Sequence, residues 1–267
     1  KSEPMPKLIS KGQIKLYSYA INKIEEPRIL IAGCGTGQHS IETAARFKNS
    51  KVLAIDLSLS SLAYAIRKTE ELEVENIEYM QADILNLGKL NRKFDIIESV
   101  GVLHHMAQPI KGWKVLTECL KTGGLMKVGL YSELARQHIV KIRKEINQTN
   151  CGSNDEEMRY FRRKIIGSDK EHHKLILNSG DFYSLSTLKD LLFHVQEHRV
   201  TIPQIKECLS RLKLKFCGFE NPKIVSKFKQ SFNHGDDLYN LDKWQRFEET
   251  NPDIFVGMYI FWCQKVD

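Results

Sequence analysis

The residues best suited to chemistry are the three glycines of Gly33-Cys34-Gly35-Thr36-Gly37, which follow the apolar run Ile29–Ala32. Glycines permit a tight turn and close approach of a ligand to the backbone, and a following helix offers free N–H groups to an anion. The spacing is GxGxG, whereas a dinucleotide fingerprint is GxGxxG. This turn suits a compact carboxylate better than a pyrophosphate. The candidate binding residues here are Gly33, Cys34, Gly35, Gly37 and Gln38.

Acidic residues follow the next two apolar runs. Asp56, with Leu57 behind it, follows the second expected strand, and Asp83, followed by Ile84, follows the third. A carboxylate in the first place can accept hydrogen bonds from both hydroxyls of an unphosphorylated ribose, and one in the second place can accept from an adenine amino group. Each acid can also act simply as a helix cap. Glycine, acid and acid at three successive strand ends favour a nucleoside-containing ligand.

Histidines and an arginine follow the next two expected strands. His104 and His105 come after the fourth strand, where a near-neutral imidazole can accept a proton as a catalytic base. The alternative is that one of them hydrogen-bonds the helix that follows. Tyr131 and Arg136 come after the fifth strand, and Arg136 can bind a substrate carboxylate or phosphate, or pair with Glu133 at the surface.

The stretch His194-Val195-Gln196-Glu197-His198 matches the HxxEH pattern of inverted zincins. On a helix, its two imidazoles would share one face and could bind zinc. No third ligand is evident, so we expect His194 and His198 to line a substrate pocket or to be structural, and we predict no metal site. Tyr183 and the nearby Asp181 are weaker candidates for the same pocket.

Short apolar runs alternate with amphipathic stretches over most of the chain. This alternation predicts an α/β fold, with a mostly parallel sheet covered by helices on both faces. The expected helices include Ser40–Phe47, Ser60–Leu72, Pro109–Leu120 and Ile202–Leu212. The expected strands are Arg28–Ala32, Lys51–Ile55, Ile77–Met80, Phe94–Glu98, Leu125–Gly129, Leu214–Phe219 and Ile254–Gln264.

We expect a single domain in four segments. Residues 1–26 form an N-terminal helical segment, and residues 27–131 form the ligand-binding core. Residues 132–200 are polar and helix-rich, which predicts an insertion that covers the substrate site as a lid. Residues 201–267 complete the sheet and contain a second, mixed insertion at Asn221–Asn251.

The composition is that of a globular protein, with 267 residues, 42% of them hydrophobic and 27% charged. Forty Lys and Arg against 33 Asp and Glu give a net charge of +7, but the excess is spread along the chain. The one basic run with aromatic residues, Arg159–Lys164, is more typical of a solvated helix face than of a nucleic-acid contact. Six cysteines without a CxxC pair predict reduced thiols in a cytoplasmic protein. No signal peptide or membrane-spanning run is visible.

The glycine turn, the acidic residues after the second and third strands, and the segment from the fourth strand to the histidines resemble the class I S-adenosylmethionine-dependent methyltransferases. The resemblance covers residues 27–131 and, more weakly, residues 201–267. More narrowly, Gly129–Arg136 and Phe193–Arg199 resemble the methyltransferase domains of bacterial tetratricopeptide-repeat proteins, which implies an N-terminal repeat domain in a longer chain. Thr122 departs from the proline common in the turn before the fifth strand. The resemblance rests on Gly33–Gly37, Asp56, Asp83-Ile84, Phe94–His105 and Leu120–Leu125.

The resemblance implies a Rossmann-like, seven-stranded sheet with an antiparallel last strand, and S-adenosyl-L-methionine as the cofactor, with S-adenosyl-L-homocysteine as its product. The glycines would hold the methionine part, Asp56 the ribose, and Asp83 with Ile84 the adenine. Glu98, Ser99 and His104 would stand where cofactor and substrate meet. The implied activity is methyl transfer to an oxygen or nitrogen of a small molecule or protein side chain.

Some acceptors are disfavoured. Enzymes that methylate planar amino groups of bases or glutamine place Asn/Asp-Pro-Pro-Tyr/Phe where this chain has Glu98-Ser99-Val100-Gly101. We therefore expect no nucleic-acid partner. Because no apolar run is long enough to span a bilayer, we expect no membrane partner either. Two other functions stay open. One is a non-catalytic domain that binds S-adenosylmethionine as a sensor or interaction module. The other is a nicotinamide oxidoreductase, which predicts a GxGxxG turn and an all-parallel sheet.

Overall fold

The computed structural model describes residues 14–47, 49–149, 151–194, 196–232 and 234–266. The predicted N-terminal helical segment lies partly outside these residues. Its described part contains one short 3₁₀ helix, η1 (Ala20–Lys23). The buried Gln264 side chain fixes this region to the sheet, accepting hydrogen bonds from the backbone N–H groups of Tyr17 and Ser18 and donating to the Gly123 carbonyl.

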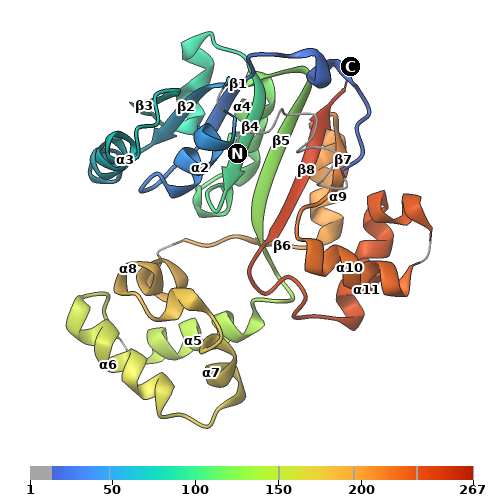
Figure 1. Cartoon of the computed structure of the whole chain (residues 1–267). Coiled ribbons are helices and arrows are strands. Elements are labelled where there is room, and N and C mark those ends of the chain that lie inside the picture. The colour runs from blue at the N-terminus through green and yellow to red at the C-terminus, as the bar shows by residue number, and fades with distance from the viewer. Residues whose placement is uncertain (1–13, 48, 150, 195, 233, 267) are drawn as a thin grey trace.

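The strands form a single sheet in the order β3-β2-β1-β4-β5-β8-β7 (Figure 1). β8 runs antiparallel to both of its neighbours, and the first five strands of the order are parallel to one another. The predicted mostly parallel sheet with an antiparallel last strand is therefore confirmed. The oxidoreductase alternative predicted an all-parallel sheet, and this prediction is wrong. The strands are β1 (Arg28–Ala32), β2 (Lys51–Asp56), β3 (Ile77–Gln81), β4 (Phe94–Val100), β5 (Leu120–Ser132), β7 (Leu214–Phe219) and β8 (Tyr259–Lys265).

Strand periodicity distributes the apolar side chains between the two faces of the sheet. Leu30 and Leu53 join the core on one face, and Ile29 and Val52 join the core on the other. Both faces are covered by helices, as predicted. These helices are α2 (Gln38–Arg46), α3 (Leu59–Glu71), η2 (Ile84–Leu90), η3 (Leu103–His105), α4 (Pro109–Cys119), α9 (Ile202–Arg211), α10 (Pro222–Ser231), η6 (Gly235–Tyr239) and α11 (Leu241–Thr250).

Two strand boundaries differ from the prediction. The last strand begins at Tyr259 rather than Ile254, because residues 252–257 form turns and bends that place Phe255 against Trp244 and Tyr259. β5 begins at Leu120, earlier than the predicted Leu125, with Gly123 at a positive φ of 79° inside it.

The predicted helical insertion after the fifth strand is present. It lies beyond the carboxyl end of β5 (Figure 1). It has an apolar core of its own, which includes Ile142, Phe161 and Phe182. The chain returns from it through the short strand β6 (Arg199–Val200), which pairs with the end of β5. The insertion contains α5 (Gln137–Gln148), α6 (Asp155–Ile166), α7 (Glu171–Ile176), η4 (Gly180–Phe182), α8 (Leu185–Leu188) and η5 (Lys189–Phe193). No helix among the described residues is both long and apolar enough to cross a membrane.

Candidate functional site

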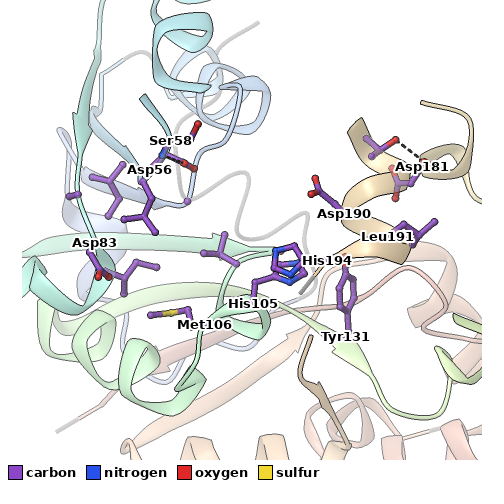
Figure 2. Close-up of a pocket in the computed structure, with 18 residues that line it drawn as sticks. Asp56, Ser58, Asp83, His105, Met106, Tyr131, Asp181, Asp190, Leu191 and His194 are labelled. Atoms are coloured by element: carbon purple, nitrogen blue, oxygen red, sulfur yellow. Dashed lines mark hydrogen bonds between the residues drawn. The ribbon is translucent and has the colours of Figure 1, made fainter. Parts of the chain in front are cut away.

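A cavity of about 620 Å³ lies between the carboxyl ends of the parallel strands and the insertion. Figure 2 shows Asp56 and Asp83 at one end, His105 and His194 close together in the middle, and Asp190 on the insertion side. The remaining lining residues are Gly33, Ile55, Leu57, Ser58, Ala82, Ile84, Gly101, Val102, Met106, Tyr131, Asp181, Thr187 and Leu191. The cavity thus joins the predicted cofactor end to the predicted substrate end.

The three glycines of the turn all have positive φ angles, but their surroundings differ. A Cβ atom at Gly33 would lie 2.3 Å from Val102, and one at Gly37 would lie 2.6 Å from Ala65. A Cβ atom at Gly35 would meet nothing within 4 Å. Gly33 and Gly37 are therefore required for close packing, whereas Gly35 faces open space that a ligand can enter.

The two predicted acids line the cavity and also organise the backbone beside it. Asp56 accepts hydrogen bonds from the backbone N–H of Gly35 (2.8 Å) and of Ser58 (2.9 Å), so its carboxylate ties the glycine turn to the end of β2. Asp83 accepts from the Leu85 N–H at 2.9 Å and caps η2. Asp83 therefore caps a helix, as the alternative interpretation predicted, and also lines the cavity.

Other predicted cofactor residues do not line the cavity. The buried Cys34 thiol has its pKa raised to about 12 by burial, and Gln38 is exposed and donates to Glu42. Glu98 lies under α2, where it contacts His39 and Thr43. Burial favours the neutral acid, but His39 and the nearby Lys127 hold the pKa of Glu98 below its ordinary value. Ser99 is fully buried beside Glu98 in the sequence.

The two predicted catalytic histidines have different environments. His104 is 1% exposed and stacks on Tyr131 with 3.8 Å between ring centroids, and burial lowers its pKa to about 2. His105 lines the cavity, and burial lowers its pKa as well. His105 Nδ1 lies 3.0 Å from the Gln196 carbonyl oxygen, which can only accept a hydrogen bond. Nδ1 therefore carries the proton, and Nε2 keeps its lone pair.

The described residues of the HxxEH stretch are not helical. The helical turn η5 ends at Phe193, His194 has extended backbone angles, and β6 begins at Arg199. The two histidines therefore do not share a helix face, which removes the geometry that a zincin-like site needs. His194 lines the cavity, with its ring 3.9 Å from that of His105. His198 instead donates its backbone N–H to the His104 carbonyl oxygen at 2.8 Å, and its ring lies beside the Gln196 side chain.

Glu197, in the middle of this stretch, is the centre of a buried ionic cluster. Its side chain is 1% exposed and accepts two hydrogen bonds from Arg136, at 2.8 and 3.2 Å. Arg143 contributes a third at 3.3 Å, and Arg199 lies 3.5 Å away. We call Glu197 and these three arginines the Glu197 cluster. It occupies the place where the chain leaves β5 for the insertion and returns through β6.

The Glu197 cluster changes the interpretation of two predicted substrate residues. Arg136 is engaged with Glu197 and lies 3.5 Å from the centre of the Tyr131 ring, while Glu133 pairs with Arg199 instead. Tyr131 lines the cavity. The predicted Tyr183 does not line it, and its hydroxyl donates to the Leu177 carbonyl on an exposed surface.

Sequence reasoning missed several lining residues. Gly101, Val102 and Met106 follow β4 and line the middle of the cavity, and the rule that ligands bind after parallel strands could have found them. Asp190 and Leu191 come from η5, in the insertion. No sequence signal marked these two, because nothing in the local pattern tells which face of the insertion meets the sheet.

The described lining of the cavity is acidic. It contains four carboxylates, those of Asp56, Asp83, Asp181 and Asp190, and neither lysine nor arginine. No ion pair joins Asp181 or Asp190 to another described residue, and both residues are exposed. This arrangement favours ligands that carry positive charge.

Comparisons with known proteins agree with the predicted cofactor site at the carboxyl ends of the parallel strands. Residues 29–124 match the family model described as "Methyltransferase domain". This part of the chain is therefore similar to methyltransferase domains. The match covers β1 to the start of β5, and so includes the glycine turn, Asp56 and Asp83.

Individual relatives extend the comparison beyond the methyltransferase domain. An uncharacterised protein of Synechococcus sp. is 28% identical over 254 residues, which are 88% of this chain and 61% of the relative. Trans-aconitate 2-methyltransferase of Deinococcus radiodurans is 30% identical over 101 residues, 38% of this chain and 36% of that protein. The solved structure of PKMT2 from Rickettsia typhi, in complex with AdoHcy, matches with a TM-score of 0.72 and 19% identity.

The PKMT2 match covers 98% of this chain and 52% of that protein. The described fold, insertion included, is therefore shared with that structure, and the fold prediction is confirmed. The chain spans about half of the length of this structural neighbour and about three fifths of the Synechococcus relative.

We predict that Glu197→Gln destabilises the protein strongly. The substitution leaves the buried guanidinium of Arg136 without a countercharge, and breaking a buried ion pair in this way costs about 3–5 kcal/mol. Urea unfolding monitored by circular dichroism measures the change. Glu133→Gln is the matched control, because the Glu133 side chain is 40% exposed and its loss should cost less than about 1 kcal/mol. Equal effects of the two substitutions would contradict the prediction.

Proposed function

We propose that this chain is an S-adenosylmethionine-dependent methyltransferase that acts on an oxygen or nitrogen of a small molecule or protein side chain, with an aliphatic amine as the favoured acceptor. The observation that carries the proposal is the single cavity that runs from the glycine turn, past His105, to the carboxylates of the insertion. A site that joined a bound cofactor to an acceptor would need this continuity.

The residues at the sheet end of the cavity fit the cofactor. The match to a methyltransferase domain supports S-adenosylmethionine as that cofactor. Gly35 leaves room beside the backbone, and Asp56 is held rigidly by two backbone N–H groups. In the proposal, Asp56 accepts from the ribose hydroxyls, while Asp83 and Ile84 bind the adenine. When bound, the cofactor supplies an electrophilic methyl group on a positively charged sulfur.

The other end of the cavity fits a cationic acceptor. Asp181 and Asp190 offer carboxylates to an ammonium group, and the absence of lysine and arginine from the described lining avoids repulsion. An ammonium group must lose a proton before its nitrogen can attack a methyl carbon. His105 is the residue proposed to take that proton, because its Nδ1 already donates to Gln196 and its Nε2 is free to accept.

Neighbouring apolar side chains support this role. Met106, Tyr131 and Leu191 line the cavity near the histidines and limit the access of water to an attacking nitrogen. Two partners keep His105 in place: the Gln196 carbonyl and the His194 ring. Alignment of the acceptor and management of one proton are the main tasks of the protein in a direct displacement.

Further parts of the proposal concern the whole protein. Six free cysteines among the described residues support a reducing compartment, and so the predicted cytoplasmic location. The N-terminal repeat domain stays a prediction from sequence resemblance. A non-catalytic domain that binds S-adenosylmethionine is the second candidate, and it differs from the first in transferring no methyl group.

We predict that Gly35→Arg abolishes cofactor binding without unfolding the protein. The new side chain projects into the open space beside the turn, and a φ of 52° is accessible to a non-glycine residue at modest cost. Calorimetric titration with S-adenosylmethionine and with S-adenosylhomocysteine should show a loss of more than about 100-fold in affinity. Gly235→Arg, where a Cβ atom also meets nothing within 4 Å, is the control. Retained affinity in Gly35→Arg would show that the turn is not the binding site.

We predict that the methylated product carries its label on an amine. The full-length protein is incubated with methyl-labelled S-adenosylmethionine and an extract of its native cells, and the labelled product is identified. Asp190→Asn should lower the rate at limiting acceptor by up to about fivefold, since an exposed charge pair contributes about 0.2–1 kcal/mol, whereas the exposed Glu249→Gln on α11 should not. Label released by mild alkali as methanol would indicate a carboxyl acceptor and reject the amine. An absence of transfer despite cofactor binding would favour the non-catalytic domain.

We predict an acidic limb in the pH dependence of this transfer. Burial lowers the pKa of His105 below its ordinary value, so the imidazole is neutral at pH 7 and becomes protonated only in more acidic solution. Activity should fall as the pH drops through this lowered pKa, at a midpoint below about 6.5. His105→Asn should lose this limb and about 10²-fold or more in rate. A limb unchanged in His105→Asn would assign the proton transfer to another group.

A further inference from the structure

The insertion contains a second cluster of chemically active side chains, on helices that do not line the cavity. Glu145 lies in the last turn of α5, and His172 and His173 lie in the first turn of α7. Their potential ligand atoms all lie within 4.8 Å of one another. We propose that Glu145, His172 and His173 form a zinc-type metal site that joins α5 to α7. The proposal does not depend on methyl transfer.

The two imidazoles converge on one carboxylate. His172 Nε2 lies 2.8 Å from Glu145 Oε1, and His173 Nε2 lies 2.9 Å from Glu145 Oε2. The two rings are 4.5 Å apart at an angle of 67°, so both present their Nε2 edges to the same point. Two histidines and one carboxylate are a common ligand set for Zn²⁺, with bonds of about 2.0–2.2 Å and a fourth position open to water. Small side-chain shifts would place an ion between these atoms.

The cluster is partly shielded from solvent. The side chains of His172 and Glu145 are 20% and 21% exposed, and that of His173 is 2% exposed.

Lys170 provides a sharp test of the proposal. Its ammonium group lies 2.8 Å from Glu145 Oε1, where it neutralises the carboxylate in place of a metal ion. The Lys170 side chain is 55% exposed and can move into solvent when an ion binds. An ammonium group competes with a metal cation for the same carboxylate, so its removal should strengthen metal binding. In a purely structural ion-pair cluster, removal of Lys170 would have no such effect.

The experiment titrates the chelator-treated full chain with ZnCl₂ by calorimetry, and repeats the titration with CoCl₂ to record the visible absorption of the metal complex. The expected result is one site of tetrahedral character that is lost in His172→Ala. Lys170→Ala should raise the affinity for zinc by about threefold to fivefold, as expected for loss of one competing contact from an exposed lysine. Lys174→Ala is the matched control, because Lys174 lies on α7, is 59% exposed, and pairs with Asp169.

Two results would overturn the proposal: zinc binding that is unchanged in His172→Ala, or an affinity that does not rise in Lys170→Ala. If His173→Ala fails to fold, the more exposed His172→Ala still tests the site, because circular dichroism of the metal-free variant reports its folding independently. Affinity for S-adenosylmethionine should be the same in wild type and His172→Ala, so a failure of this proposal is distinct from a failure of the proposed function.

Discussion

The buried carboxylate of Glu197 is the interaction on which the substrate side of the structure depends. Its three arginine partners come from different segments: Arg136 follows β5, Arg143 belongs to α5, and Arg199 begins β6. A carboxylate that is 1% exposed must be matched by opposite charge and hydrogen bonds, or it strongly destabilises the fold. The exit from the sheet and the return to it are therefore held together. The orientation of the insertion over the strand ends follows from this constraint.

The same cluster extends to the cavity wall. Arg136 packs on the face of Tyr131, Tyr131 stacks on His104, and Arg143 donates a hydrogen bond to the His194 carbonyl. His194 in turn lies against His105. A side chain that touches no open part of the cavity thus sets the positions of those that do. The sheet end of the cavity uses a simpler device, in which Asp56 ties the glycine turn to β2 through backbone N–H groups.

Contacts between residues close in the sequence could be predicted from it, whereas contacts between distant residues could not. The strands were predictable because residues such as Leu30 and Val52 are buried on a two-sided sheet, and burial on both faces leaves a nearly continuous apolar run. Asp56 and Asp83 were predictable because parallel strands end at one edge. Arg136 and Glu98 were harder, since their partners, Glu197 and His39, lie 61 and 59 residues away in the sequence. HxxEH could hold a metal only on a helix, but Gln196, Glu197 and His198 lie outside the helices and strands of the structure.

The insertion shows why polar contacts matter more here than in the sheet. Its apolar core is separate from the two cores that flank the strands, so its position is not fixed by one continuous hydrophobic interior. Hydrophobic burial is non-directional and would tolerate several orientations of such a unit. Charged hydrogen bonds have defined geometry, and an arginine that binds a carboxylate through two parallel bonds allows few orientations. Glu197 supplies this geometry where the insertion joins the sheet, and Glu145 supplies it between α5 and α7. Directional contacts at these two carboxylates therefore fix the insertion relative to the sheet and its helices relative to one another, which apolar packing alone would leave poorly defined.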